Sequence, residues 1–293
     1  MERERWLQLY ALAQALSRSW TDGHRFSTAW IVAVYFWAVL HDRPVSWACC
    51  RAHWPAEQAV GVLPSQATMS RRLRSAPVQL LLQRMEDALA QENAREEPNA
   101  PPSAETVTVI DAKPLPIGGY SKDRDARWGR SCGGCARGYK FYALWGAAPL
   151  PVAWEIQAMN VSEKRVAAQL LAQAPGRGWL LGDAQYDSNQ LYDQAFKQGY
   201  RLLAPRRKRG GLGHHYQSPH RLAAIAELEG GGWRRFHQQR TAIERHFGHW
   251  TSFGGGLAGL PSWVRTLGRV RRWVQAKLLI NALRILGKEL ANA

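Results

Sequence analysis

Cysteine and acid are scarce in this sequence, and no apolar run is long. The 293 residues include four cysteines, Cys49, Cys50, Cys132 and Cys135, which are too few for a disulfide scaffold in a chain of this size. The longest apolar run, residues 29–40, is shorter than the roughly 20 residues that a membrane span needs. It predicts a buried helix, and no membrane is expected as a partner. Because the N-terminus also lacks the apolar region of a secretory signal, we expect a cytoplasmic protein with reduced thiols.

The shortage of acid leaves a strong excess of positive charge. Lysine and arginine outnumber aspartate and glutamate by 39 to 23, which gives a formal net charge of +16. The excess is clustered: residues 206–209 are all basic, residues 265–284 hold six bases and no acid, and residues 113–140 are mostly basic. Clustered bases are typical of proteins that bind nucleic-acid phosphates. On composition alone, a basic protein without such a partner stays an alternative.

The first 93 residues predict an all-helical domain for DNA binding or assembly. Apolar residues recur at helical spacing in residues 3–18 and 78–93, and residues 27–40 predict a more buried helix. Residues 94–103 carry charges and three prolines, which indicates a linker.

A short basic segment, residues 65–74, lies inside this helical domain. Ser65 is placed to cap a helix that ends near Arg71, Arg72 and Arg74. The pattern resembles the second helix of a helix-turn-helix, so these arginines are candidate DNA ligands. A solvated basic helix end is the alternative, because cations near a helix C-terminus are favourable anyway.

The pattern changes after the linker, and residues 104–293 predict an α/β domain. Strands are expected at 106–110, 138–145, 152–156, 179–181 and 201–204, and helices at 162–174, 188–198 and 218–228. Three strands in succession, followed by alternating strands and helices, indicate a mixed sheet flanked by helices. Residues 205–235 form a basic, glycine-rich insertion, and a last helical section begins near residue 238.

Carboxylates follow two of the expected strands. Asp111 comes directly after the first strand, and Asp183 lies two residues after the strand 179–181. Acids at strand ends face the crevice where α/β proteins bind ligands, and hard carboxylate oxygens suit Mg²⁺. Glu244 is the best third acid, because it flanks an apolar helical face and has Arg240 one turn before it. Each of these acids also has a purely structural explanation: an aspartate after a strand can be a turn residue or a helix cap, and Glu244 can form an i,i+4 ion pair with Arg240.

Four motifs in order resemble the DDE transposases of bacterial insertion sequences. They are Val109–Ile117, Arg137–Tyr142, Leu181–Ser188 and the Arg240-x-x-x-Glu244-Arg245 signature, within roughly residues 105–285. The resemblance implies an RNase H-like catalytic fold in which Asp111, Asp183 and Glu244 form the catalytic, metal-binding triad. It also implies Mg²⁺ or Mn²⁺ as the cofactor, with two ions expected.

The resemblance further implies a transposase that cleaves transposon ends and joins them to target DNA. Its partner is then double-stranded DNA, comprising inverted repeats at the ends and a target, with two copies of the chain assembled on it near a prokaryotic nucleoid. The basic residues expected to contact DNA are Arg71, Arg72, Arg74, Lys113, Lys140, Arg206, Arg207, Lys208, Arg209, Arg240, Arg245, Arg271 and Arg272. Two alternatives stay open: an RNase H-like nuclease without strand transfer, and a catalytically dead DNA-binding protein derived from a transposase.

Overall fold

The chain forms two compact units. The computed structural model describes residues 2–21, 23–56, 61–96, 106–131, 133–207, 212, 215–232, 238, 240–241, 256–257 and 259–292. The helical unit comprises residues 1–98, 250–264 and 269–293, and the sheet unit comprises residues 99–249 and 265–268. Each unit is described by itself.

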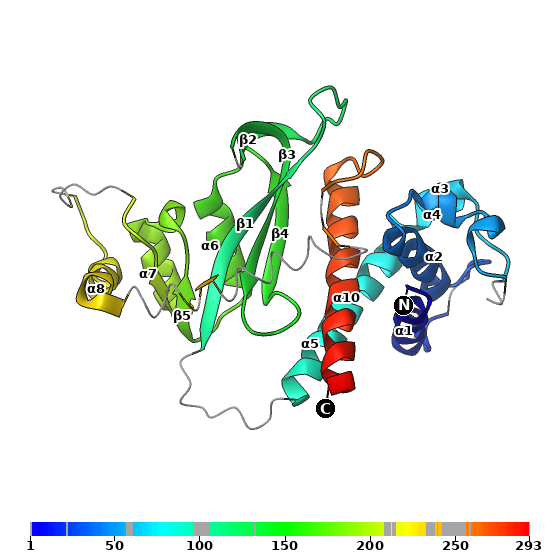
Figure 1. Ribbon diagram of the computed structural model, residues 1–293, viewed down its shortest axis with the longest axis horizontal. Helices are drawn as coiled ribbons and strands as arrows, with labels where there is room; N and C mark the ends of the chain where they lie inside the picture. The colour runs from blue at the N-terminus through cyan, green and yellow to red at the C-terminus, as the bar shows by residue number, and fades with distance from the viewer. Residues whose placement is uncertain are drawn as a thin grey trace. The chain divides into compact units, whose positions relative to one another are not determined.

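The helical unit is built around one helix that is buried on nearly every side. Its elements are α1 (Glu2–Ser17), α2 (Thr28–Leu40), α3 (Val45–Ala48), η1 (Arg51–His53), α4 (Gln66–Arg72), α5 (Ala76–Glu96) and most of α10 (Leu267–Asn292) (Figure 1). In α2 every residue except Trp30 is buried, because the segment is apolar all round. The Ser27 side chain caps α2 by accepting from the Trp30 amide at 3.1 Å.

The C-terminal helix α10 belongs with these N-terminal helices from residue 269 onward. Lys277 of α10 is only 3% exposed, and its Nζ donates to the Val39 carbonyl at 3.1 Å and to Asp42 Oδ1 at 2.5 Å. This contact ties α10 to the end of α2. The grouping differs from the boundaries that we expected, which placed residues 104–293 in one domain, because contacts distant in sequence decide where α10 packs.

The sheet unit holds a mixed six-stranded sheet. Its strands are β1 (Val107–Pro116), β2 (Arg127–Ser131), β3 (Gly134–Trp145), β4 (Ala153–Ala158), β5 (Gly178–Leu181) and β6 (Tyr200–Leu203). The strand order is β2-β3-β1-β5-β6, and β4 pairs with β3 beyond the stretch that β2 occupies. β1 runs antiparallel to β3 and parallel to β5, which is parallel to β6. The expected RNase H-like mixed sheet and the helical N-terminal region are therefore confirmed.

Short helices pack on this sheet. They are α6 (Glu163–Gln173), η2 (Ala184–Tyr186), α7 (Asn189–Lys197), α8 (Pro219–Glu227) and η3 (Leu228–Gly232). α6 packs against β3 and β4 as well as α7, and α7 and α8 pack against β6 (Figure 1). The expected basic insertion at 205–235 thus contributes α8 and η3 among the residues that the structure describes.

Across the described ranges, the structure contains no helix that is both long and apolar enough to span a membrane.

Candidate active site

Two aspartates occupy matching positions on neighbouring parallel strands. Asp183 lies two residues beyond β5, but Asp111 lies inside β1, opposite Ala143, and not directly after a strand as we expected, because pairing with β3 extends β1 to Pro116. In the pairing of β1 with β5, Val109 lies opposite Leu181. Asp111 and Asp183 each follow that last pair by two residues. Parallel strands lie about 4.8 Å apart and rise about 3.3 Å per residue, so the register brings both acids to one level along the direction of the two strands. The structure thus brings together two residues that are 72 positions apart in sequence.

Asp183 is held by the turn that it begins. It is the N-cap of η2, where its Oδ1 accepts a hydrogen bond from the Gln185 amide at 2.7 Å. Burial raises the pKa of the Asp183 carboxyl. The negative charge of Glu163 raises that pKa further, whereas the Gln185 amide and the charge of Arg240 lower it. Burial beside a second carboxylate disfavours the charged form of Asp183, and a bound cation would relieve this.

Asp111 shares its surroundings with Asp183. Asp111 Oδ1 accepts from the Ala112 amide at 2.7 Å. Burial raises the pKa of Tyr186 well above its ordinary value, and the negative charges of Asp111, Glu163 and Asp183 raise it further. The three acids therefore surround one tyrosine, which is 1% exposed and whose hydroxyl has no hydrogen-bond partner among the described residues.

Glu163 is a residue of this site that the sequence analysis did not single out. It lies in the first turn of α6 and accepts an ion-pair hydrogen bond from Lys140 Nζ at 2.6 Å. The Lys140 side chain is 7% exposed, so its charge is largely removed from solvent. An acid in a helix's first turn is favoured by the helix dipole alone, and the sequence therefore carries no separate signal for a site role.

A buried ion pair fixes the turn that follows Asp183. Arg221 of α8 donates to Asp187 through Nε at 2.6 Å and through Nη2 at 2.9 Å. The Arg207 amide donates to the same carboxylate at 3.0 Å, and Lys164 Nζ donates to the Asp187 carbonyl at 3.0 Å. Burial alone would raise the pKa of Asp187, but the Arg221 hydrogen bond and the Arg207 amide outweigh it and lower the pKa. Asp187 therefore anchors the turn and does not serve as a free ligand.

The expected third acid, Glu244, lies outside the described residues, as do Arg245, Lys208 and Arg209. Arg240, four residues before Glu244 in the sequence, is described, and its charge lowers the pKa of Asp183. Arg240 therefore lies within electrostatic range of Asp183. Among described residues, no cluster of three or more His, Cys, Asp or Glu side chains is arranged to hold a metal ion.

A groove lined by basic residues adjoins the aspartates. Its volume is about 360 Å³, and its lining includes Arg130, Lys140, Lys164, Gln185 and Arg207. Gln185 belongs to the turn that begins at Asp183, so the groove and the acids share a wall. Lys140 and Arg207 were expected to contact DNA. Arg130 and Lys164 were not, because each lies at a separate position in the sequence and only the fold gathers them.

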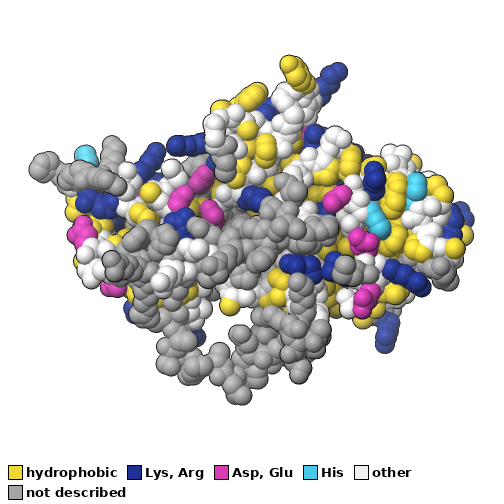
Figure 2. All heavy atoms as spheres, viewed as in Figure 1, with side chains coloured by type: hydrophobic (Ala, Val, Ile, Leu, Met, Phe, Trp, Pro, Cys, Tyr) yellow, Lys and Arg dark blue, Asp and Glu magenta, His cyan; other side chains and the backbone are white. Residues whose placement is uncertain are grey.

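The remaining predicted DNA ligands have varied surroundings. In the sheet unit, Arg206 is half-buried, and so is Lys113, opposite Phe141 in the β1–β3 pair. In the helical unit, Arg71 and Arg271 are exposed. On the face shown in Figure 2, Lys and Arg side chains occur over both units.

Arg72 is engaged inside the helical unit. Its guanidinium donates to the Phe26 carbonyl and to Thr28 Oγ1, each at 3.0 Å. These bonds join α4 to the start of α2. Arg74 and Arg272 instead line a cavity of the helical unit.

Comparison with known proteins gives one match. Residues 102–269, more than half of the chain, match the family model described as a transposase DDE domain. No curated protein and no solved structure matches the chain. The matched segment includes both aspartates, Glu163, and the position of Glu244.

Proposed function

Because the chain belongs to the family of transposases with a DDE domain, we propose that it cuts DNA at transposon ends and transfers the cut strands to target DNA. Membership of this family implies DNA cleavage for transposition in general, and the use of divalent metal ions. The finer proposal is that Asp111, Asp183 and Glu244 are the catalytic residues, and that they hold two Mg²⁺ or Mn²⁺ ions.

The observation that carries this proposal is the register of β1 and β5. This register supports the proposal, because Asp111 and Asp183 each follow the Val109–Leu181 pair by two residues. The donor set fits hard divalent cations, because carboxylate oxygens are the ligands that these ions prefer. The raised pKa of Asp183 fits as well, since a cation would offset the burial and the nearby Glu163 charge.

Each part of the site has a separate task in this proposal. Asp111 and Asp183 would hold the ions from the sheet unit, and Glu244, four residues after Arg240, would complete the set. Divalent ions bound there would supply activation of a water or a DNA 3′-hydroxyl for in-line attack and stabilisation of the leaving oxygen. The Asp187–Arg221 pair keeps the Asp183 turn in place, because positioned ligands avoid reorganisation during the reaction.

The basic groove beside the acids is the proposed path of the cut strand. Lys140, Lys164, Arg130 and Arg207 line it, and each phosphate that such residues neutralise releases a counterion. Lys140 is oriented by Glu163, so its ammonium is held at the groove wall. We further propose that two copies of the chain assemble on the paired ends.

Glu244→Gln is the sharpest test of the third acid. The change removes one charge and almost no volume, so we expect DNA binding to persist and Mg²⁺-dependent cleavage to fall at least about 100-fold, roughly 2.7 kcal/mol. Cleavage is measured on DNA that carries the inverted repeats flanking the gene, beside a binding assay on the same preparation. If Glu244 were only an ion-pair partner of Arg240, the variant would cleave within a few-fold of the parent.

Glu227→Gln is the matched control for Glu244→Gln. Glu227 is exposed at the end of α8, so the same change there should leave both cleavage and binding unaltered. Scoring joined products as well as cut ends separates the proposed transposase from a nuclease without strand transfer. DNA binding by the parent without any cleavage would instead identify a catalytically dead relative.

A further inference from the structure

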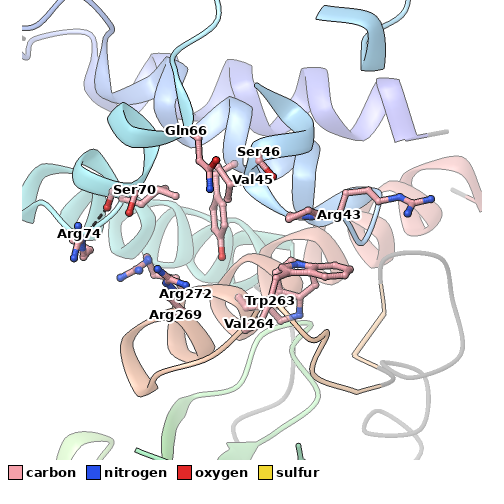
Figure 3. Close-up of a pocket in the computed structure, with 14 residues that line it drawn as sticks. Arg43, Val45, Ser46, Gln66, Ser70, Arg74, Trp263, Val264, Arg269 and Arg272 are labelled. Atoms are coloured by element: carbon pink, nitrogen blue, oxygen red, sulfur yellow. Dashed lines mark hydrogen bonds between the residues drawn. The ribbon is translucent and has the colours of Figure 1, made fainter. Parts of the chain in front are cut away.

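A second basic cavity lies wholly inside the helical unit. Its volume is about 160 Å³, similar to the roughly 150 Å³ of a cavity that accommodates benzene, so a phosphate group has room in it. The wall includes Ser70 and Arg74 from the α4 region, Trp263 from the segment before α10, and Arg269 and Arg272 of α10. Figure 3 shows Arg74, Arg269 and Arg272 together at one side of this cavity, with Arg43 pointing away from them.

The three clustered arginines have no acid to neutralise them among the described residues. The described lining of the cavity contains no aspartate or glutamate, and none of the three arginines forms an ion pair within the described part of the chain. Arg74 Nε donates to the Ser70 carbonyl at 2.9 Å, which orients its guanidinium. Burial lowers the pKa of Arg272; Tyr35 acts in the opposite direction, and the positive charges of Arg269 and Arg74 lower the pKa further. Like charges held this close destabilise one another unless an anion joins them.

The position of Arg269 adds to this imbalance. Arg269 lies in the first turn of α10, where the helix dipole disfavours a cation and favours an anion. Arg272 follows one turn later, so the two guanidinium groups project from the same side of the helix. Asp125 Oδ2 already accepts from the Leu267 amide at this helix end, at 2.9 Å, but it does not line the cavity.

Unsatisfied donors in the same wall point to a missing acceptor. The indole N–H groups of Trp263 and Trp273 are both buried, and neither has a hydrogen-bond partner among the described residues. Both tryptophans line the cavity. A buried donor without an acceptor costs about 1–3 kcal/mol. Guanidinium and indole groups supply only donors, so the fitting ligand is an anion with several acceptor oxygens.

We propose that this cavity binds a phosphate group of DNA through Arg74, Arg269 and Arg272. The choice of DNA as the source of the phosphate rests on the proposed function. The site is separate from the DDE acids, and it is assembled from the two ends of the chain, because α4 and α10 both contribute to it. It would hold the DNA backbone without reading the bases, since a phosphate contact carries no sequence information directly.

The test is the salt dependence of duplex DNA binding by the full chain. Arg269 is exposed, so Arg269→Gln should fold normally. We expect the log–log slope of affinity against salt to become shallower by about 0.9, one phosphate contact. Arg84→Gln is the matched control, because Arg84 lies on α5 of the same unit, outside the cavity, and its loss should leave the slope unchanged. Trp263→Phe keeps an aromatic ring, smaller than the indole, and removes the N–H, and it should weaken binding by a few-fold.

A second measurement identifies the source of the phosphate. Inorganic phosphate should raise the melting temperature of the parent and of Arg84→Gln, and it should raise that of Arg269→Gln less. Loss of this effect with an unchanged DNA slope would show that the occupant is not DNA. Equal slopes and equal phosphate shifts in all variants would overturn the site itself. A parent that cleaves DNA while Arg269→Gln keeps its slope contradicts only this inference, whereas a parent that binds no DNA contradicts the proposed function.

Discussion

The basic side chains beside the two candidate sites differ in their partners, although the helical unit also holds an ion pair of the buried Lys277 with Asp42. In the sheet unit, Lys140 is paired with Glu163 and Arg221 with Asp187, and both pairs border the turn or groove of the candidate site. In the helical unit, Arg74, Arg269 and Arg272 face a cavity whose described lining contains no acid. A basic side chain that is paired with an acid of the protein stabilises the local structure, whereas a basic side chain without such a partner is available to bind an external anion. The contrast therefore distinguishes basic residues that an acid holds in place, such as Lys140, from basic residues that have no acid partner among the described residues.

The contrast is testable first through Arg221, where we expect the largest loss of stability. Arg221→Gln leaves the Asp187 carboxylate buried without its bidentate partner, and breaking such a buried pair costs about 3 kcal/mol. The free energy of unfolding in urea measures this loss. Because the turn that carries Asp183 is anchored by the same carboxylate, cleavage should fall as well.

The double variant Arg221→Gln/Asp187→Asn is the control for that loss. It removes the uncompensated charge together with its partner, and it should recover part of the lost stability. If the double variant is as unstable as the sum of the two single variants, the two residues do not act as a pair.

The same pair predicts an acid-dependent loss of stability. The pKa of Asp187 is lower in the folded protein than its ordinary value, so the folded state favours the charged form. The stabilisation is then fully present above the unfolded pKa of about 3.9 and is lost as the pH falls through the folded pKa. The unfolding free energies of the parent and of Asp187→Asn should therefore differ at neutral pH and converge in acid. A difference that stays constant down to the acid limit would contradict this.

A smaller effect distinguishes Arg72 from its neighbour Arg71 in the helical unit. Arg72 donates to the Phe26 carbonyl and Thr28 Oγ1, so Arg72→Gln should lower the free energy of unfolding by about 1–2 kcal/mol. Arg71 is exposed, and Arg71→Gln should change stability by less than about 0.5 kcal/mol. Thermal unfolding of both variants checks the difference. Equal stability losses would show that the Arg72 contacts contribute nothing.

Much of the local structure was predictable, because the signals for it are local. The β-branched run Val107–Ile110 predicts a strand, and Ser65 and Ser27 are observed as caps of α4 and α2. The sequence also predicted that Asp111 and Asp183 follow two strands, which holds for Asp183 after β5, whereas Asp111 lies inside β1 because pairing with β3 lengthens that strand. Periodicity, capping and strand propensity depend on residues that are close together along the chain, and they can therefore be predicted from the sequence.

β2 is a strand that the local sequence signals do not predict. Its residues, Arg127–Ser131, have no alternating pattern, and the strand exists because it pairs with Gly134–Gly138 of β3. The Lys140–Glu163 pair likewise joins a strand to a helix 23 positions later. Which distant segments pair as strands depends on the tertiary structure, and a short stretch of sequence does not specify it.

The sequence by itself determined which acids accompany the expected strands, the charge excess and the two kinds of secondary structure. Only the tertiary structure decided that β1 and β5 align Asp111 with Asp183, that Arg72 turns inward, and that α10 joins the N-terminal helices. The physical reason is the same in each case. A side chain's chemistry is a property of its residue, but its burial and its partners depend on contacts between residues that are far apart in the chain.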